Sequence, residues 1–237
     1  MDNWQEEQIQ SLLNIDSEAS FFKELNQIAR GLGFEYCAYG MRLPLPVSAP
    51  KLVMLNNYSS AWQQRYAEQN YLAIDPTVAH GMRSVAPLIW SENVFANCRP
   101  FWEEAQAQGL RVGWALACHD ARGIGGLLSL SRAEDPLTAK ELDSISPRTH
   151  WLTQIAHQSL AGLLVAEHMP EANVQLTSRE VEVLRWTADG KTSWETSDIM
   201  NISERTVNFH INNTMAKLGV SNKTAAAIKA AILGLLG

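Results

Sequence analysis

The chain has 237 residues, of which 46% are apolar and 19% are charged, so it is long enough for two domains and too apolar to be disordered throughout. No apolar run approaches the roughly 18 residues of a membrane span, and the acidic, polar residues 1–7 lead us to expect no secretory signal. The net charge of −6 argues against a strongly basic surface, and three scattered cysteines (Cys37, Cys98 and Cys118) suit a reducing, cytoplasmic location rather than disulfides.

The first part of the chain alternates between strand-like and helix-like segments. Strands rich in β-branched, leucine and aromatic residues are predicted at 36–43, 51–56, 87–90, 112–119 and 125–132. Helices are predicted at 6–13, 21–32, 59–69, 76–82, 99–108 and 138–166, the last of them broken or kinked at Pro147. The short turn at 120–123 predicts an antiparallel hairpin. The expected fold class is α+β, with helices on both faces of an antiparallel sheet in an α-β-α sandwich.

Aromatic residues with polar tips gather between residues 58 and 90. Tyr58, Trp62 and Tyr66 recur every four residues and should share one helix face. For a single tyrosine or tryptophan, core packing is a more common explanation than a ligand site. Asp75 precedes Pro76, so it can cap the next helix, or it can be a buried carboxylate that accepts a hydrogen bond from a ligand amide. Both alternatives remain open at the level of sequence.

A hydroxyl is expected on the buried face of the last strand. Alternation places Ser129 on the same face as Leu127 and Ser131. A buried hydroxyl needs a hydrogen-bond partner, which a bound ligand would supply.

No catalytic motif is visible. The sequence has no nucleophile elbow, phosphate-binding loop or zinc-protease motif, and its six histidines are scattered. Cys118, His119 and Asp120 are consecutive on a strand, so their side chains point to opposite faces and cannot converge. We therefore expect no catalytic residues, no metal site and no cofactor.

A polar segment with one proline, residues 167–175, interrupts the helical pattern. We interpret it as a linker between a domain at 1–166 and a second domain at 176–237. Residues 1–175 carry a net charge of −7 and residues 176–237 carry +1. DNA binding by the second domain would therefore depend on local placement of charge and on two copies.

The second domain is predicted to contain four helices. Thr177 with Glu180, and Thr192 with Glu195, have the spacing of capping boxes. Ser203 is the expected cap of the third helix. The fourth helix should begin at a Ser221 cap and continue to Leu236.

The third of these helices has two distinct faces. Its buried face should comprise Val207, Ile211, Thr214 and Leu218. Its other face should comprise Arg205, Asn208, Phe209 and Asn212. Asparagine can pair with adenine in the major groove, and the preceding turn is short enough for a helix-turn-helix. A helical bundle without DNA-binding activity is the alternative. The fourth helix carries an apolar stripe suited to pairing with a second copy, formed by Ala225, Ile228, Ile232 and Leu235.

Taken together, these motifs resemble those of the LuxR-type quorum-sensing transcription regulators, most closely the LasR, RhlR and QscR branch. In the first domain the resemblance is carried by residues 57–62, 75–77, 87–90 and 101–105, with Arg65 and Tyr66. In the second domain it is carried by residues 176–180, 190–192 and 206–210. It covers essentially the whole chain.

The resemblance implies a ligand, N-acyl-L-homoserine lactone, and roles for individual side chains. Trp62 would donate to the lactone carbonyl, Asp75 would accept from the ligand amide, and Thr77 would support Asp75. Tyr58 and Ser129 would donate to the amide carbonyl, and Trp90 would pack against the lactone ring. The acyl chain would be lined by Tyr66, Val78, Phe101, Leu110 and Leu127.

The resemblance also implies a cytoplasmic homodimer that binds double-stranded promoter DNA and acts with RNA polymerase, without a membrane partner. The DNA contacts would be made by Thr192, Arg205, Thr206, Asn208, Phe209, Asn212 and Lys223. Two other hypotheses remain: a ligand-independent regulator whose sandwich domain only dimerises, and a lactone hydrolase fused to a DNA-binding domain. The second is disfavoured because no nucleophile, base and orienting group occur together.

Overall fold

The computed structural model describes residues 10–237, which form two compact units. The first consists of most residues before Leu164. The second consists of the residues from Leu164 onward together with two short loops, Pro44–Pro50 and Asp120–Gly123. Among residues 10–237, no helix combines the length and apolarity needed to cross a membrane.

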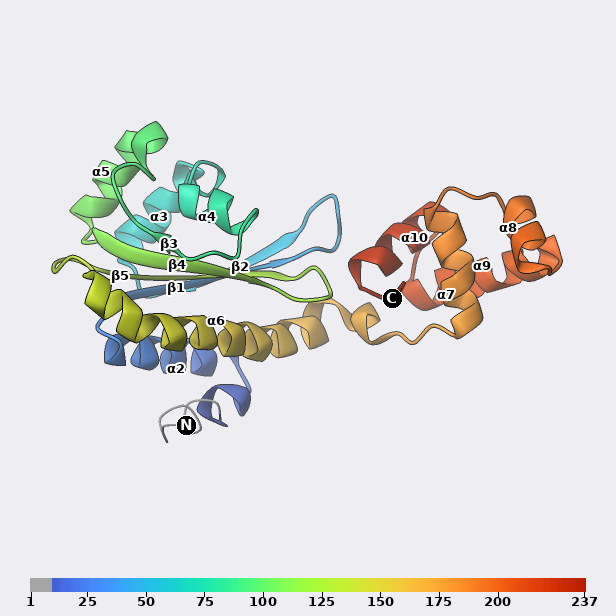
Figure 1. The fold of residues 1–237 in the computed structure, drawn as a ribbon, viewed down its shortest axis with the longest axis horizontal. Coiled ribbons are helices and arrows are strands. Elements are labelled where there is room, and N and C mark those ends of the chain that lie inside the picture. Colours follow the sequence, from blue (N-terminus) through green and yellow to red (C-terminus); the bar gives the residue numbers. More distant parts are fainter. Residues whose placement is uncertain (1–9) are drawn as a thin grey trace. The chain divides into compact units, whose positions relative to one another are not determined.

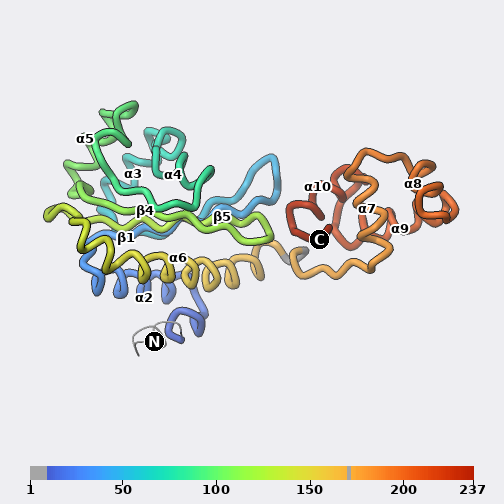
Figure 2. The backbone as a smooth tube through the Cα atoms, in the orientation of Figure 1, coloured from blue at the N-terminus to red at the C-terminus, as the bar shows by residue number. Residues whose placement is uncertain are grey.

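The first unit is built on one five-stranded antiparallel sheet in the order β2-β1-β5-β4-β3. Its strands are β1 (Tyr36–Leu43), β2 (Lys51–Asn56), β3 (Leu88–Ile89), β4 (Val112–His119) and β5 (Gly125–Arg132). The predicted hairpin is confirmed, with Trp114 of β4 opposite Leu130 of β5; its tight connection can be followed in Figure 2. Only the strand predicted at 87–90 is shorter than expected.

Helices cover both faces of the sheet, as Figure 1 shows, so the predicted α-β-α sandwich is confirmed. One face carries α3 (Ser60–Glu68), α4 (Pro76–Gly81) and α5 (Arg99–Ala107), and the other carries α2 (Glu18–Gly31) and α6 (Ala139–His168). Three short 3-10 helices complete the chain path: η1 (Tyr71–Ala73), η2 (Ala96–Cys98) and η3 (Pro170–Asn173). Of the helix predicted at 6–13, residues 10–13 are helical and the remainder lies outside the described residues.

The two faces of the sheet have different compositions. The face toward α6 carries large, fully buried side chains, among them Tyr39, Trp114 and Leu128. The face toward α3, α4 and α5 carries mostly small residues, namely Ala38, Gly40, Gly113, Ala115, Ala117, Ser129 and Ser131. Gly81 of α4 identifies which face lies under the helices, because a Cβ added to it would contact Leu127 and Ala117 on the sheet. Small residues leave space above the sheet for side chains of the helices or for a ligand.

Of the break or kink expected at Pro147, the break is wrong, because α6 spans 30 residues and includes Pro147. The proline removes one hydrogen bond of the helix ladder. Nearby side chains add others, since the Thr149 hydroxyl donates to the carbonyls of Ile145 and Ser146. The helix also buries Leu152 and Ala156 completely. Tertiary packing therefore holds the helix together where local sequence predicts an interruption.

After η3, the second unit contains four helices: α7 (Ser178–Ala188), α8 (Ser193–Met200), α9 (Glu204–Leu218) and α10 (Lys223–Ile232). Both predicted capping boxes are present, at Thr177 and at Thr192. The expected buried face of α9 is confirmed, with Val207, Ile211, Thr214 and Leu218 at most 5% exposed.

The prediction for the fourth helix is wrong at both ends. Its cap is Asn222 rather than Ser221, because the Asn222 side chain accepts from the backbone N–H of Ala225 at 2.8 Å. The helix ends at Ile232, and two residues later Gly234 adopts a positive φ of 67°, which a continuing helix does not allow. Leu235 of the predicted apolar stripe therefore lies beyond the helix.

Candidate functional site

An aromatic cluster forms above the small-residue face of the sheet. Its buried members come from α3, η1, α5 and the segment before α5: Trp62, Tyr71, Phe95, Phe101 and Trp102. Trp62 and Phe101 are stacked, with ring centroids 5.9 Å apart, and Tyr66 packs edge-on against Trp62. Edge and offset contacts of this kind stabilise an aromatic core and leave ring edges for polar contacts.

Asp75 lies beside this cluster and has two structural roles. Its Oδ1 accepts from the backbone N–H of Thr77 at 2.8 Å and from the Thr77 hydroxyl at 2.7 Å, which caps α4. Its Oδ2 accepts from the Tyr66 hydroxyl at 3.0 Å. Burial raises the pKa of the Asp75 carboxyl, and the bonds from Thr77 and Tyr66 only partly oppose that rise. The site thus holds a carboxylate that is costly to keep charged.

An ion pair joins helices α3 and α5 of the site. The Arg65 guanidinium on α3 makes two hydrogen bonds to Glu104 on α5, at 2.8 and 2.7 Å. The Tyr71 hydroxyl donates to the same carboxylate at 2.9 Å. The contacts with Arg65 and Tyr71 lower the pKa of Glu104 to about 2. Sequence reasoning missed this contact, because residues 39 apart give no local signal.

The sheet beneath the cluster becomes more open along β5. Ser131 is fully buried, Ser129 is 7% exposed, and Leu127 is half-buried. On the neighbouring strand β1, a Cβ added to Gly40 would meet nothing within 4 Å. The region above the sheet is therefore closed near Ser131 and has free space near Gly40.

Trp90 closes the same end of the sheet. Its backbone N–H donates to the carbonyl of Gly113 at 2.9 Å, and its ring lies over that glycine, where a Cβ would be 2.1 Å from a ring carbon. The ring also packs edge-on against Phe95 and Trp102. Gly113 is thus required by the close approach of Trp90, a role that sequence reasoning did not identify.

The structure brings most of the predicted ligand residues together. Tyr58, Trp62, Tyr66, Trp90, Phe101 and Leu110 belong to the aromatic cluster. Asp75 and Thr77 join it through Tyr66, and Leu127 lies under Gly81 of α4. Ser129 shares the sheet face of Leu127, and Val78 follows Thr77 on α4, half-buried. Their roles in binding a ligand remain predictions.

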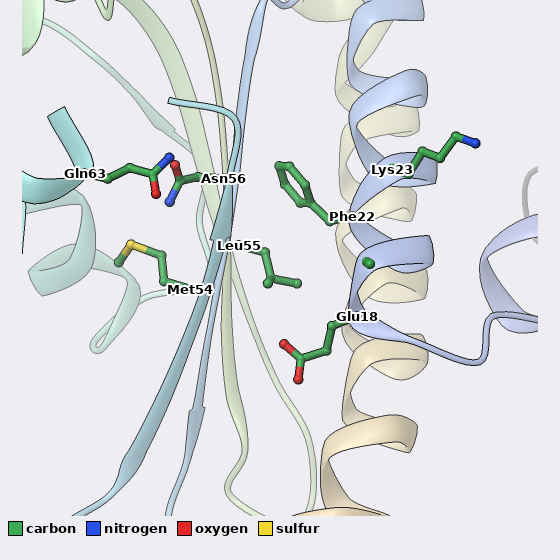
Figure 3. Close-up of a pocket in the computed structure, with 8 residues that line it drawn as sticks. Glu18, Phe22, Lys23, Met54, Leu55, Asn56 and Gln63 are labelled. Carbon is green, nitrogen blue, oxygen red and sulfur yellow. The ribbon is translucent and has the colours of Figure 1, made fainter. Parts of the chain in front are cut away.

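A separate shallow hollow lies along the edge strand β2, shown in Figure 3. Leu55 points toward α2, which contributes Glu18 and Phe22, whereas Asn56 points toward Gln63 of α3. None of the predicted ligand residues lines it. Among residues 10–237, no group of three histidine, cysteine or acidic side chains is placed to hold a metal ion.

The outer face of α9 is the candidate DNA interface. Arg205, Asn208 and Asn212 are exposed, Phe209 is 59% exposed, and together with Glu204 these residues line a surface hollow. The Ser193 hydroxyl of α8 donates to Asn208 Oδ1 at 2.8 Å, which orients that amide. An exposed face with one cation, two amides and an aromatic ring can contact both phosphates and base edges.

The other predicted DNA residues do not line this hollow. Lys223 is exposed at the first position of α10. The Thr192 hydroxyl donates to Glu195 at 2.9 Å in its capping box, and the Thr206 hydroxyl pairs with Ser203 at 2.8 Å. Both threonine hydroxyls therefore have hydrogen-bond partners within the protein, as the Asn208 amide oxygen also does.

Comparison with known proteins covers both units. The chain matches the family model of the autoinducer binding domain over residues 17–160 and that of the luxR family of bacterial regulatory proteins over residues 174–230. The transcriptional activator protein AnoR of Acinetobacter nosocomialis is 47% identical over 238 residues, which cover 100% of both chains. The quorum-sensing regulator RhlR of Pseudomonas aeruginosa is 40% identical over 94% of this chain and 92% of its own.

Solved structures agree with this likeness. The crystal structure of Escherichia coli SdiA matches with a TM-score of 0.82 and 33% identity, covering 99% of this chain and 98% of that one. SdiA in complex with octanoyl-rac-glycerol matches with a TM-score of 0.81 and the same identity, covering 100% and 97%. The fold and the order of the two units are thus shared along the full length.

Proposed function

Because this chain belongs to the luxR family of transcription regulators and carries an autoinducer binding domain, we propose that it binds an N-acyl-L-homoserine lactone and that its homodimer binds palindromic promoter DNA. The main support is Asp75, a half-buried carboxylate beside a cluster of aromatic rings with polar edges. Such a carboxylate can accept from the N–H of an amide, while the rings enclose the apolar parts of the same molecule.

The remaining roles follow from the chemistry of an acyl amide. An amide has one donor and one acceptor, and leaving either unpaired in a dry site costs about 1–3 kcal/mol. Asp75 takes the amide N–H, and the hydroxyls of Tyr58 and Ser129 serve the amide carbonyl. Trp62 donates to the lactone carbonyl, and the acyl chain runs toward Leu127 and the free space at Gly40.

Thermal unfolding of the purified full chain tests this proposal. A ligand that binds only the folded protein stabilises it by about 2.7 kcal/mol at roughly 100 times its dissociation constant. We expect the melting temperature to rise with lactones of at least one acyl length between four and fourteen carbons. Octanoyl-rac-glycerol must be tested in parallel as a second ligand, since a structure of SdiA in complex with it is known. A shift with the glycerol ester alone, or with neither compound, would refute the lactone proposal.

DNA binding as a dimer is supported by the two surfaces of the second unit. The outer face of α9 has few cations, so one copy of the domain offers few contacts to DNA phosphates. On α10, Ala225, Ile228 and Ile232 lie outside the buried set, and Ile228 is 48% exposed. This stripe suits pairing with a second copy, with half-site centres about 10 base pairs or a multiple apart. Analytical ultracentrifugation with and without operator DNA measures the stoichiometry.

The domain boundaries, the location and the partner in transcription are part of the same proposal. We place the ligand domain at 1–166, the linker at 167–175 and the DNA-binding domain at 176–237, in a cytoplasmic regulator that acts with RNA polymerase. Limited proteolysis should cut first within 167–175. Mass spectrometry of the lactone after incubation addresses the hydrolase alternative: an intact lactone supports a receptor, and a hydrolysed one supports an enzyme.

A further inference from the structure

Two buried polar atoms lie at the closed end of the sheet without a partner. Ser131 Oγ and Trp90 Nε1 are each inaccessible to solvent, and neither has a hydrogen-bond partner within the described part of the chain. Ser131 is 0% exposed. A buried polar group without a partner costs free energy, so such groups in a folded protein call for an explanation.

The two atoms lie over neighbouring positions on the same face of the sheet. Ser131 on β5 is the register partner of Gly113 on β4, and the Trp90 ring covers Gly113. The ring carbon bonded to Nε1 is one of the atoms nearest to where the Gly113 Cβ would be, at 2.6 Å. Cβ positions of directly paired residues in an antiparallel sheet are about 4.5–5.5 Å apart. Ser131 Oγ and Trp90 Nε1 therefore border one small region.

This region lies at one end of the proposed ligand site. Ser129 is two residues from Ser131 on the same face, or about 6.7 Å along the strand. Leu127 lies the same distance from Ser129 in the opposite direction, toward the free space at Gly40. With the amide of the ligand at Ser129 and the acyl chain toward Leu127, the head group points to Ser131 and Trp90.

We propose that the Ser131 hydroxyl and the Trp90 indole N–H form a polar pair that hydrogen-bonds an oxygen of the lactone ring and selects a lactone over a carbocyclic head group. This inference rests on the proposed function. A lactone ester has two oxygens and more lone pairs than the Trp62 indole can use. Both groups of the pair can donate, and an ester oxygen accepts. The pair thus gains in the complex the partner that it lacks within the protein.

The test compares two compounds with the same acyl chain, chosen as the chain that stabilises the wild-type protein most. One is the N-acyl-L-homoserine lactone, and the other is the N-acylcyclopentylamine, which keeps the amide and the ring but lacks both ring oxygens. Dissociation constants for both compounds are measured with wild type, Ser131→Ala and Trp90→Phe. We expect each variant to lower the preference for the lactone over the cyclopentylamine by about five- to tenfold, and Ser131→Ala to change the affinity for the cyclopentylamine little.

Ser129→Ala is the matched control, because it removes a hydroxyl from the same face of the same strand. It should raise the dissociation constants of both compounds by the same factor, since both compounds keep the amide carbonyl. The ligand-free melting temperature of Ser131→Ala should stay the same or rise, because the lost hydroxyl had no partner. Equal losses for both compounds in Ser131→Ala and Trp90→Phe would overturn the inference, as would unchanged preferences. If no lactone stabilises the wild type, the proposed function itself fails.

Discussion

The Tyr66 hydroxyl donates to Asp75 Oδ2 at 3.0 Å, while the other carboxylate oxygen of Asp75 caps α4 through Thr77. The two roles that the sequence leaves open for Asp75 are therefore compatible. The cap is confirmed, and both of its hydrogen bonds from Thr77 go to Oδ1. Oδ2 faces a hydroxyl from the aromatic cluster, where an amide N–H of a ligand can share it.

This geometry predicts the effect of Asp75→Asn. The amide side chain keeps an oxygen for the cap, and asparagine caps helices about as well as aspartate. It loses the charge that strengthens a bond to a ligand N–H, which we expect to cost about 1.5–3 kcal/mol. The lactone concentration for half-maximal response in a reporter assay should rise at least tenfold.

Stability serves as the control for this substitution. Because burial raises the pKa of Asp75, its carboxylate is disfavoured in the folded state, so removing the charge should not lower the ligand-free melting temperature. Tyr66→Phe leaves both carboxylate oxygens in place and should change the response less than Asp75→Asn. An unchanged lactone response in Asp75→Asn would leave the cap as the only role of this residue.

The approach of Trp90 to Gly113 predicts a second effect. Gly113→Ala would place a Cβ 2.1 Å from the Trp90 ring, which must then move. Overpacking of this kind costs about 1–3 kcal/mol, and it would also displace the wall of the proposed head-group site. We expect a lower melting temperature in thermal unfolding and a smaller shift with the lactone.

Gly40→Ala is the matched control, since Gly40 lies on the same face of the sheet with nothing within 4 Å of its Cβ position. It should leave the ligand-free melting temperature close to that of the wild type. Similar destabilisation by Gly40→Ala and Gly113→Ala would show that loss of any glycine from this face is harmful, and would remove the specific role of Trp90.

Local and long-range features differ in how far the sequence predicted them. Four strands have the expected bounds, and both capping boxes occur, because alternation and capping depend on neighbouring residues. The Arg65–Glu104 pair and the Trp90–Gly113 contact join distant segments and left no pattern to detect. Pro147 misled the prediction because burial of α6 outweighs one lost hydrogen bond.

Glu180 predicts a dependence of stability on pH. Burial acts to raise its pKa, but the bonds from Lys217 at 2.7 Å and from Thr177 outweigh this and lower it. A lowered folded-state pKa contributes stability above the unfolded pKa of about 4.3, which is lost as the pH falls through the folded pKa. Hydrogen exchange in peptides from α7 and α9 should therefore show weakening protection below about pH 4.3 in the wild type.

Glu180→Gln should remove most of this pH dependence and cost about 1–3 kcal/mol at pH 7, because Lys217 loses its charged partner. Glu195 provides the comparison. It closes the same kind of capping box with Thr192, but its carboxylate contacts in that box are to Thr192 alone. In Glu195→Gln, the backbone amides of α7 and α9 should therefore be as protected from hydrogen exchange as in the wild type. If the two variants reduced this protection equally, the capping box and not the Lys217 contact would be its cause.

The outer face of α9 predicts two classes of DNA-binding variant. Asn208 and Asn212 have amides that can pair with base edges, so Asn208→Ala and Asn212→Ala should each cost about 1–3 kcal/mol and relax the base preference at particular operator positions. Arg205 and Lys223 are exposed cations suited to phosphates. Arg205→Ala and Lys223→Ala should weaken binding to all sequences and reduce the slope of affinity against salt.

Selection from randomised duplexes, followed by affinity measurements at several salt concentrations, separates these classes. Ser193→Ala is an informative control, because it removes only the hydroxyl that orients the Asn208 amide. If Asn208 contacts a base, Ser193→Ala should relax the base preference at the same operator position as Asn208→Ala does, but to a smaller degree. If the wild type enriches no inverted repeat, or if the asparagine variants lose affinity without any change in the selected bases, the surface that contacts the bases is not the outer face of α9.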